Sequence, residues 1–223
     1  AGDRTGLLKL FQPGLRPIHP LPLDPGLEPL VSDLLNLTDL RWGLAVSNVG
    51  ALGQVYSARA AGRGPWPPWV EGAFILRGGA DGGPFEGLEL FLEGPGPTGP
   101  RATLDRLLQA FLSRDLQAAM AAFSPEVSAF GGLLDHRTEG RLALQGSVEA
   151  AFQMSSLEIT LTAWCGSRAL RAWRAGALDG RGNQAVVEGL TLQAFAPDHR
   201  IQEQETFLAI LDALRILTPR PRS

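Results

Sequence analysis

Residues 184–208, QAVVEGLTLQAFAPDHRIQEQETFL, are the stretch that decides the fold. A segment rich in apolar residues, 184–195, and a more polar one, 200–208, flank a turn at Asp198. Segments of this length on either side of a turn signal are typical of paired strands. The stretch therefore predicts two long neighbouring strands near the carboxyl end of the chain.

Two more strands are predicted just before this stretch, at about 157–164 and 168–178. The first alternates along its length, which predicts that its odd-numbered and even-numbered residues lie on opposite faces of a sheet. The two sets are Leu157, Ile159, Leu161 and Ala163 against Glu158, Thr160, Thr162 and Trp164.

Helices are predicted on both sides of these strands. Thr103 and Asp115 each precede apolar residues at helical spacing, so we expect each to cap a helix. The second of these helices is expected to end at Ser124-Pro125. A short strand at 127–130, a loop at 135–140 and a third helix at about 144–154 follow. A last helix is expected at 210–217. This order predicts an α+β fold.

The first half of the chain is expected to be a shortened version of the second. Residues 1–23 form a proline-rich arm, and a helix begins at Asp24-Pro25. Four strands are then expected, at 42–48, 54–61, 69–77 and 87–93. The domains we predict are the arm, a repeat at 24–93, a Gly/Pro linker at 94–101, a complete domain at 102–218 and a tail at 219–223.

The two halves also share a sequence pattern at a constant shift. Leu27 falls on Leu144, a shift of 144 − 27 = 117 residues, and the match extends to Phe91 on Leu208 without a gap. At this shift Val70-Glu71-Gly72 falls on Val187-Glu188-Gly189, and Tyr56 falls on Trp173. The preserved register over four strands predicts an internal repeat.

The complete domain resembles the nuclear transport factor 2-like superfamily, in its SnoaL-like polyketide cyclase branch. The residues that carry the resemblance are Leu104–Phe111, Leu116–Val127, Val187-Glu188-Gly189 and Asp198–Glu203. The resemblance implies a curved, mostly antiparallel sheet that curls into a cone, with helices roofing a ligand pocket. Family members commonly dimerise through their sheets, so the first half is expected to form an internal pseudo-dimer with the second, and self-association through sheet faces is expected too.

The same resemblance leaves two kinds of function open. Cyclase-like members often carry a catalytic Asp just after the last strand, whereas this chain has Ala209 there and Asp212 three residues later. We therefore expect a small-molecule-binding or scaffold protein without that acid. The alternative is a cyclase, isomerase or hydratase with Glu188 or Glu205 as general base.

Three residues are the candidates for catalysis. Glu188 is expected on the core side of its strand, where a carboxylate has a raised pKa unless it forms an ion pair with Arg171 or Arg174. Glu205 forms an i, i+2 pair with Glu203, which fits either divided acid and base roles or a solvated face. His136 lies in a polar loop and fits either a proton shuttle or an exposed side chain.

The candidates for ligand binding are Trp164, Trp173, Arg171 and Glu203. Aromatic rings and guanidinium groups can stack on and pair with a small hydrophobic or aromatic ligand, although Trp and Arg also pack at subunit contacts and in cores. The histidines and the single Cys165 have no ligand spacing, so we expect neither a metal site nor another cofactor.

Composition points to an ordinary globular protein. The net charge of −3 favours neither nucleic acid nor an anionic membrane, and no apolar run is long enough for a membrane span. One cysteine and no recognisable secretion signal favour a cytoplasmic location. The abundance of Ala, Gly, Pro and Leu with a single lysine, Lys9, suggests a bacterial source with GC-rich coding.

Overall fold

The computed structural model describes residues 4–21, 26–48, 50–60, 68–78, 83–131, 134–178 and 183–208. The predicted helix start at Asp24-Pro25, Ala209, and the predicted last helix and tail lie outside these residues. His136 has a described backbone but no described side chain. None of the described helices has the length and hydropathy that a membrane span requires.

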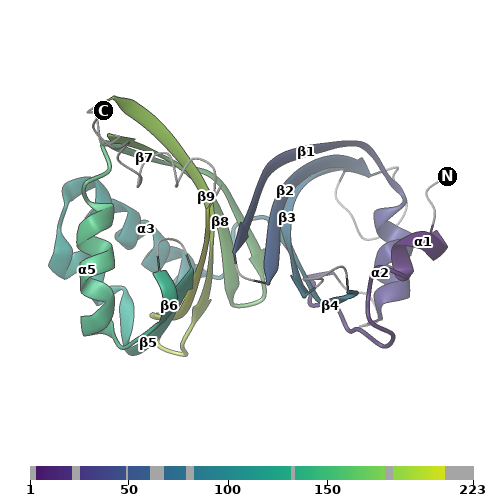
Figure 1. Ribbon diagram of the computed structural model, residues 1–223, viewed down its shortest axis with the longest axis horizontal. Helices are drawn as coiled ribbons and strands as arrows, with labels where there is room; N and C mark the ends of the chain where they lie inside the picture. The colour runs from purple at the N-terminus through teal and green to yellow at the C-terminus, as the bar shows by residue number, and fades with distance from the viewer. Residues whose placement is uncertain are drawn as a thin grey trace, which may run out of the picture.

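Helices lie at both ends of a central sheet, as Figure 1 shows. The helices are α1 (Arg4–Leu8), α2 (Leu27–Leu34), α3 (Thr98–Ser113), α4 (Leu116–Ala121) and α5 (Arg141–Ala151). The first-half strands are β1 (Leu37–Asn48), β2 (Ala51–Ala60), β3 (Trp69–Gly78) and β4 (Phe85–Glu93). The second-half strands are β5 (Phe123–Gly131), β6 (Leu134–Glu139), β7 (Ser156–Cys165), β8 (Arg168–Leu178), β9 (Gln184–Phe195) and β10 (Ile201–Leu208).

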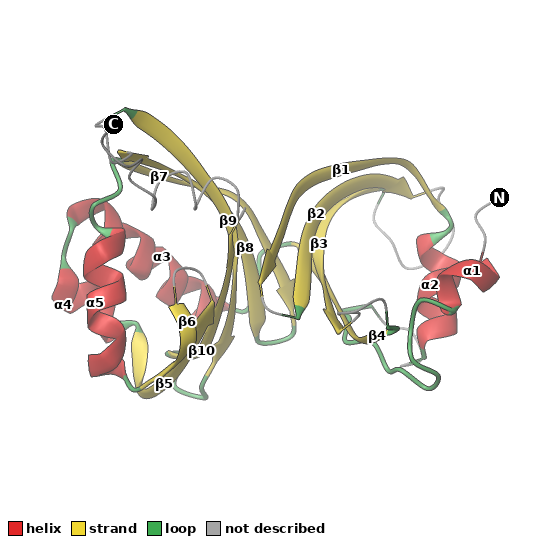
Figure 2. Ribbon diagram, in the orientation of Figure 1, coloured by secondary structure: helices red, strands yellow, loops and turns green. Residues whose placement is uncertain are grey.

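The strands form a strongly curved sheet in the order β1-β2-β3-β4-β7-β8-β9-β10-β5-β6. Neighbours are antiparallel except for β10 and β5, which are parallel. Only two residue pairs join β4 to β7, and the strands of the two halves curve away from each other on either side of the centre (Figure 2). This confirms the predicted α+β class with a curved, mostly antiparallel sheet roofed by helices.

Two β-bulges decide which side chains of the second half face inwards. We call the face towards α3 and α5 the inner face, and the face towards the first half the outer face. The pairing of β7 with β8 slips between Ile159 and Leu161, and that of β10 with β9 slips between Ile201 and Glu203. An extra residue reverses the faces beyond it and bends the strand. The unbroken alternation predicted for 157–164 is therefore wrong.

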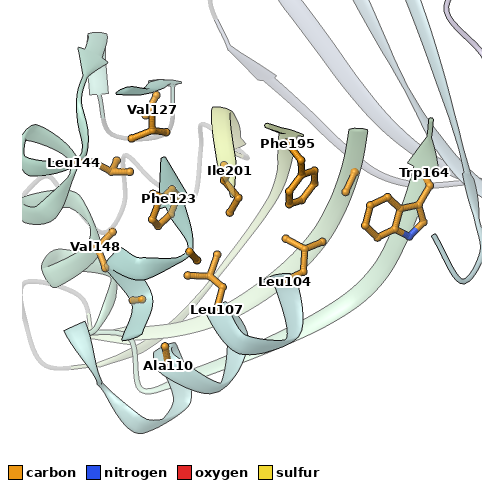
Figure 3. Packing of buried hydrophobic residues seen from close by; sticks show 14 residues of the cluster. Leu104, Leu107, Ala110, Phe123, Val127, Leu144, Val148, Trp164, Phe195 and Ile201 are labelled. Atoms are coloured by element: carbon orange, nitrogen blue, oxygen red, sulfur yellow. The ribbon is translucent and has the colours of Figure 1, made fainter. Parts of the chain in front are cut away.

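The helices of the second half close the inner face over an apolar core. Fourteen buried apolar side chains around Leu107 and Phe123 make up this core, and the half-buried Phe111 and Phe152 pack against it. Figure 3 shows Leu104 and Leu107 of α3 pointing towards the strand residues Phe195 and Ile201. Trp164, beyond the β7 bulge, belongs to the same core, which consists of Leu104, Leu107, Ala110, Ala119, Ala122, Phe123, Val127, Ala129, Leu144, Val148, Trp164, Ala169, Phe195 and Ile201.

The outer face of the second half packs against the sheet of the first half. Leu190, Leu192 and Phe207 from the second half join Ile75 and Phe91 from the first in one buried cluster. The sheets approach so closely at Gly53 that a Cβ atom there would lie 2.7 Å from Leu190 Cδ1. Apolar burial between the halves is therefore continuous across the molecule. The pseudo-dimer itself stays a prediction.

The proline-rich arm runs beside β4 and packs apolar side chains into the core of the first half. Phe11 and Ile18 form isolated bridges with Phe85 and Glu89 of β4, and Leu21 is buried beside Leu30 of α2. The arm thus extends the edge of the sheet at β4, and α1 and α2 lie at the same end of the molecule (Figure 1).

Three local predictions are wrong for identifiable reasons. α3 begins at Thr98, inside the predicted linker, because a proline in the first helical turn breaks no hydrogen bond there. Thr103 is therefore buried within α3 and does not cap it, whereas Asp115 does cap α4 by accepting a hydrogen bond from Ala118 N at 2.9 Å. The predicted loop at 135–140 is largely β6, which pairs with β5.

Candidate functional site

A cavity of about 660 Å³ lies between the inner face of the second half and its helices. Aromatic rings from α3, β5 and β8 line it, and small residues of α5 such as Ala151 complete the wall. Its apolar lining consists of Leu107, Leu108, Phe111, Phe123, Ala129, Phe130, Leu144, Val148, Ala150, Ala151, Met154, Leu157, Ile159, Trp173, Ala177, Val187 and Leu208, with Gly131 and Gly146. Its volume and lining are typical of pockets for small organic molecules.

Arg171 brings a positive charge to this apolar space. It lies on the inner face of β8, is only 9% exposed, and is the one charged residue among the described residues that line the cavity. Burial lowers its pKa to about 10, although Asp105 acts in the opposite direction. The guanidinium is therefore still protonated at neutral pH.

A strip of polar side chains runs beside Arg171 on β9 and β10. Gln193 Nε2 donates to Gln204 Oε1 at 2.9 Å, and the Thr191 and Thr206 hydroxyls lie 3.5 Å apart. Each pair occupies directly opposed positions of the two strands. The Trp173 indole donates to Thr191 Oγ1 at 2.9 Å, which fixes its ring against the strip. Hydroxyl, amide and guanidinium groups can thus orient a bound molecule.

Glu188 does not face this cavity. It shares the outer face with Leu190 and Leu192, as predicted, but that face packs on the first half and opens to solvent near Val186, which is 54% exposed. Arg174 Nη2 lies 3.2 Å from Glu188 Oε1. The ion pair that the sequence left open as an alternative is therefore present, and the core on this side of β9 is the cluster between the two halves, not the cavity.

Glu205 and Glu203 also lie on the outer face, where they line a separate polar hollow of about 280 Å³. Glu205 accepts hydrogen bonds from Arg77 Nη2 at 2.6 Å and Asn48 Nδ2 at 2.8 Å. Burial raises the pKa of Glu205, but these hydrogen bonds, from Arg77 and then Asn48, outweigh burial and hold the pKa below its ordinary value. A carboxylate held in this way is a weak base.

The residues predicted to bind a ligand separate into two groups. Arg171 and Trp173 line the cavity. Trp164 is buried in the core and stacks on Phe195 with ring centroids 6.2 Å apart, and Glu203 lies on the outer face. The side chain of His136 lies outside the described residues.

Sequence reasoning missed the polar strip, although a signal for it exists. The strands contain Thr-x-Gln at Thr191–Gln193 and the reverse order, Gln-x-Thr, at Gln204–Thr206. Antiparallel pairing therefore places each threonine opposite a threonine and each glutamine opposite a glutamine. Cross-strand pairs of this kind are a unit of sheet structure.

Among the described residues, no cluster of His, Cys, Asp or Glu could hold a metal ion.

The chain is similar in fold to a solved structure, the crystal structure of a nuclear transport factor 2-like protein of unknown function from Burkholderia pseudomallei. The two share 16% sequence identity, the match covers 55% of this chain and 100% of that chain, and the TM-score is 0.49. It is also similar to SalBIII, an epoxide hydrolase/cyclase-like enzyme in pyran ring formation in polyether salinomycin, with 14% identity, 51% and 92% covered, and a TM-score of 0.46.

At such identities the likeness concerns the fold alone. No protein-family model and no curated protein matches the chain.

Proposed function

We propose that this protein binds a small, largely apolar molecule in the cavity of its second half. The observation that carries the proposal is the cavity itself, about 660 Å³ of space whose described walls are mostly aliphatic and aromatic. Pockets of about 300–1,000 Å³ with a few placed polar groups are typical of ligand sites. Arg171 and the Thr191–Gln193 strip would supply those polar groups.

Binding has more support than acid–base catalysis. The alternative enzyme needs Glu188 or Glu205 as a base, but both carboxylates lie on the outer face in ion pairs with arginine. The described lining consists of apolar groups, hydroxyls, amides and one guanidinium. Such a set can hold and orient a molecule, whereas a general base needs a group that gains and loses a proton near neutral pH.

The test is a fluorescence titration with N-phenyl-1-naphthylamine, a neutral apolar probe. We expect saturable binding to the wild-type protein and a loss of at least tenfold in affinity for Ala151→Trp, which places an indole in the cavity wall. Ala143→Trp is the matched control, because Ala143 is an exposed residue of the same helix, α5. An absence of saturable binding, or equal affinities for the two variants, would overturn the proposal.

A further inference from the structure

Arg171 is a buried cation without a described partner. Its Nε atom is buried and has no hydrogen-bond partner in the described part of the chain, and no described carboxylate lies within ion-pair distance. The carboxylate that acts on it from further away, Asp105 of α3, is 72% exposed at its side chain and lies 4.0 Å from Arg101. Among the described residues, the positive charge of Arg171 in this apolar cavity therefore has no neutralising group beside it.

Such an arrangement is unfavourable unless something else supplies the counter-charge. A buried charge has lost its hydration, and the loss is offset when an opposite charge or several hydrogen bonds replace the water. Arg174, three residues along the same strand, faces the other way and has Glu188 as its partner. Arg171 is thus the arginine of β8 that faces the ligand space, where a bound molecule could provide its counter-ion.

The groups next to Arg171 suit an acid. Thr191 occupies the β9 position directly opposite Arg171. Because the Thr191 hydroxyl oxygen already accepts from Trp173, its own hydrogen remains available to an oxygen in the cavity or to Thr206. A carboxylate can accept two parallel N–H bonds from a guanidinium and a further bond from a hydroxyl.

We infer that the ligand of this cavity is an apolar monocarboxylic acid whose carboxylate pairs with the Arg171 guanidinium, an inference that rests on the proposed function. One negative charge balances one positive charge in the cavity. A neutral molecule leaves the guanidinium without a counter-ion in the described part of the chain. A dianion such as a phosphate monoester adds a second charge, for which the described lining offers no second cation.

The test compares acids with their neutral amides of nearly the same shape. Calorimetry at pH 7.5 measures the binding of 2-naphthoate against 2-naphthamide and of decanoate against decanamide. We expect at least one acid to bind about tenfold or more tightly than its amide, because hydrogen bonds to a charged group discriminate by that factor or more. Arg171→Met should abolish this preference and leave amide binding in place.

Two more variants serve as controls. Arg174→Met removes an arginine from the opposite face of the same strand and should keep the full preference for the acid. Arg171→Lys keeps the positive charge but lacks the planar pair of donors, so it should keep part of the preference for the acid that Arg171→Met loses. The comparison of acid with amide in the wild-type protein decides the matter even if a variant fails to fold.

The outcomes separate the two proposals. If the amides bind as tightly as the acids, or if the preference persists in Arg171→Met, the inference about the acid is overturned and the proposed function stands. If none of the four compounds binds although N-phenyl-1-naphthylamine does, the inference about the acid is overturned and the proposed function stands. If the naphthylamine does not bind either, the proposed function is overturned and the inference falls with it.

Discussion

Arg171 connects the stability of the protein with its proposed function at the scale of one residue. Because burial lowers the pKa of this base, the folded protein releases its proton at a lower pH than the unfolded chain does. The destabilisation is therefore fully present below about pH 10 and is lost as the pH rises further. This lowering of the Arg171 pKa corresponds to a loss of about 3 kcal/mol in the free energy of unfolding at neutral pH.

Replacing Arg171 by methionine should stabilise the protein. The side chain keeps much of its length and apolar contact but no longer holds a buried charge, so we expect the free energy of unfolding to rise by about 2–3 kcal/mol. Urea denaturation at pH 7 measures the change. Arg174→Met, which removes an exposed ion pair, should change it by less than about 1 kcal/mol. A large loss of stability in Arg171→Met would show that the guanidinium has a structural role.

At the scale of elements, the sequence predicts the strands better than their faces. Periodicity and turn residues place β8 and β9 almost as the structure has them, and the Asp115 cap is correct. The bulges after Ile159 and Ile201 exchange inner and outer faces, and apolar residues line both faces because the outer one packs on the first half. Alternation alone therefore cannot show which face holds the cavity, and Glu188 lies on the face without it.

Gly189 shows how a strand is shaped around the site. It lies directly opposite Trp173, whose ring crosses it, and a Cβ atom there would lie 2.7 Å from the carbonyl oxygen of Phe207. Gly72 lies in the same way opposite Tyr56 in the first half. An aromatic residue that packs over a glycine on the neighbouring strand stabilises a sheet. Here the same contact with Gly189 also holds the Trp173 indole against the cavity.

Substituting this glycine should therefore be costly. We expect Gly189→Ala to lower the free energy of unfolding by about 1–3 kcal/mol, because the backbone of Phe207 cannot move aside without disturbing β10. Gly146→Ala is the control: it lies within α5 with no atom within 4 Å of the added Cβ and should gain about 0.5–1 kcal/mol. Thermal and urea unfolding of the two variants measure both signs, and a neutral Gly189→Ala would contradict the close approach.

At the scale of the whole molecule, the two halves share an order of elements but differ inside. α2 and β1–β4 follow one another as α5 and β7–β10 do, and the pairs Trp42–Tyr56 and Ile159–Trp173 occupy the same register 117 residues apart. The polar strip does not recur, because Phe74 and Leu76 occupy the positions of Thr191 and Gln193 at this shift. The arm packs into the core of the first half, while the second half keeps the cavity. The internal repeat stays a prediction.

The joint between the halves contains a charged network as well as the apolar cluster. Glu205 of β10 accepts hydrogen bonds from Arg77 of β3 and Asn48 of β1, so one carboxylate of the second half binds two strands of the first. Arg77 also pairs with Glu89, which in turn pairs with Arg168 of β8. These groups are partly or fully buried, where removing one partner leaves the others unsatisfied.

Replacing Glu205 by glutamine should therefore weaken the joint in a way that depends on pH. At pH 7 we expect the free energy of unfolding to fall by about 1–3 kcal/mol, because glutamine brings no charge to the Arg77 guanidinium. The pKa of Glu205 is lowered in the folded state, so its contribution is present above its ordinary value of 4.5 and is lost as the pH falls through the folded value. The difference between wild type and variant should accordingly shrink below pH 4.5, and urea denaturation from pH 3 to 7 measures it.

Glu203→Gln is the control, because Glu203 is an exposed neighbour on the same face. Its free energy of unfolding should stay within about 0.5 kcal/mol of wild type throughout. A Glu205→Gln difference that is constant over this range would mean that shape, and not charge, makes the contact.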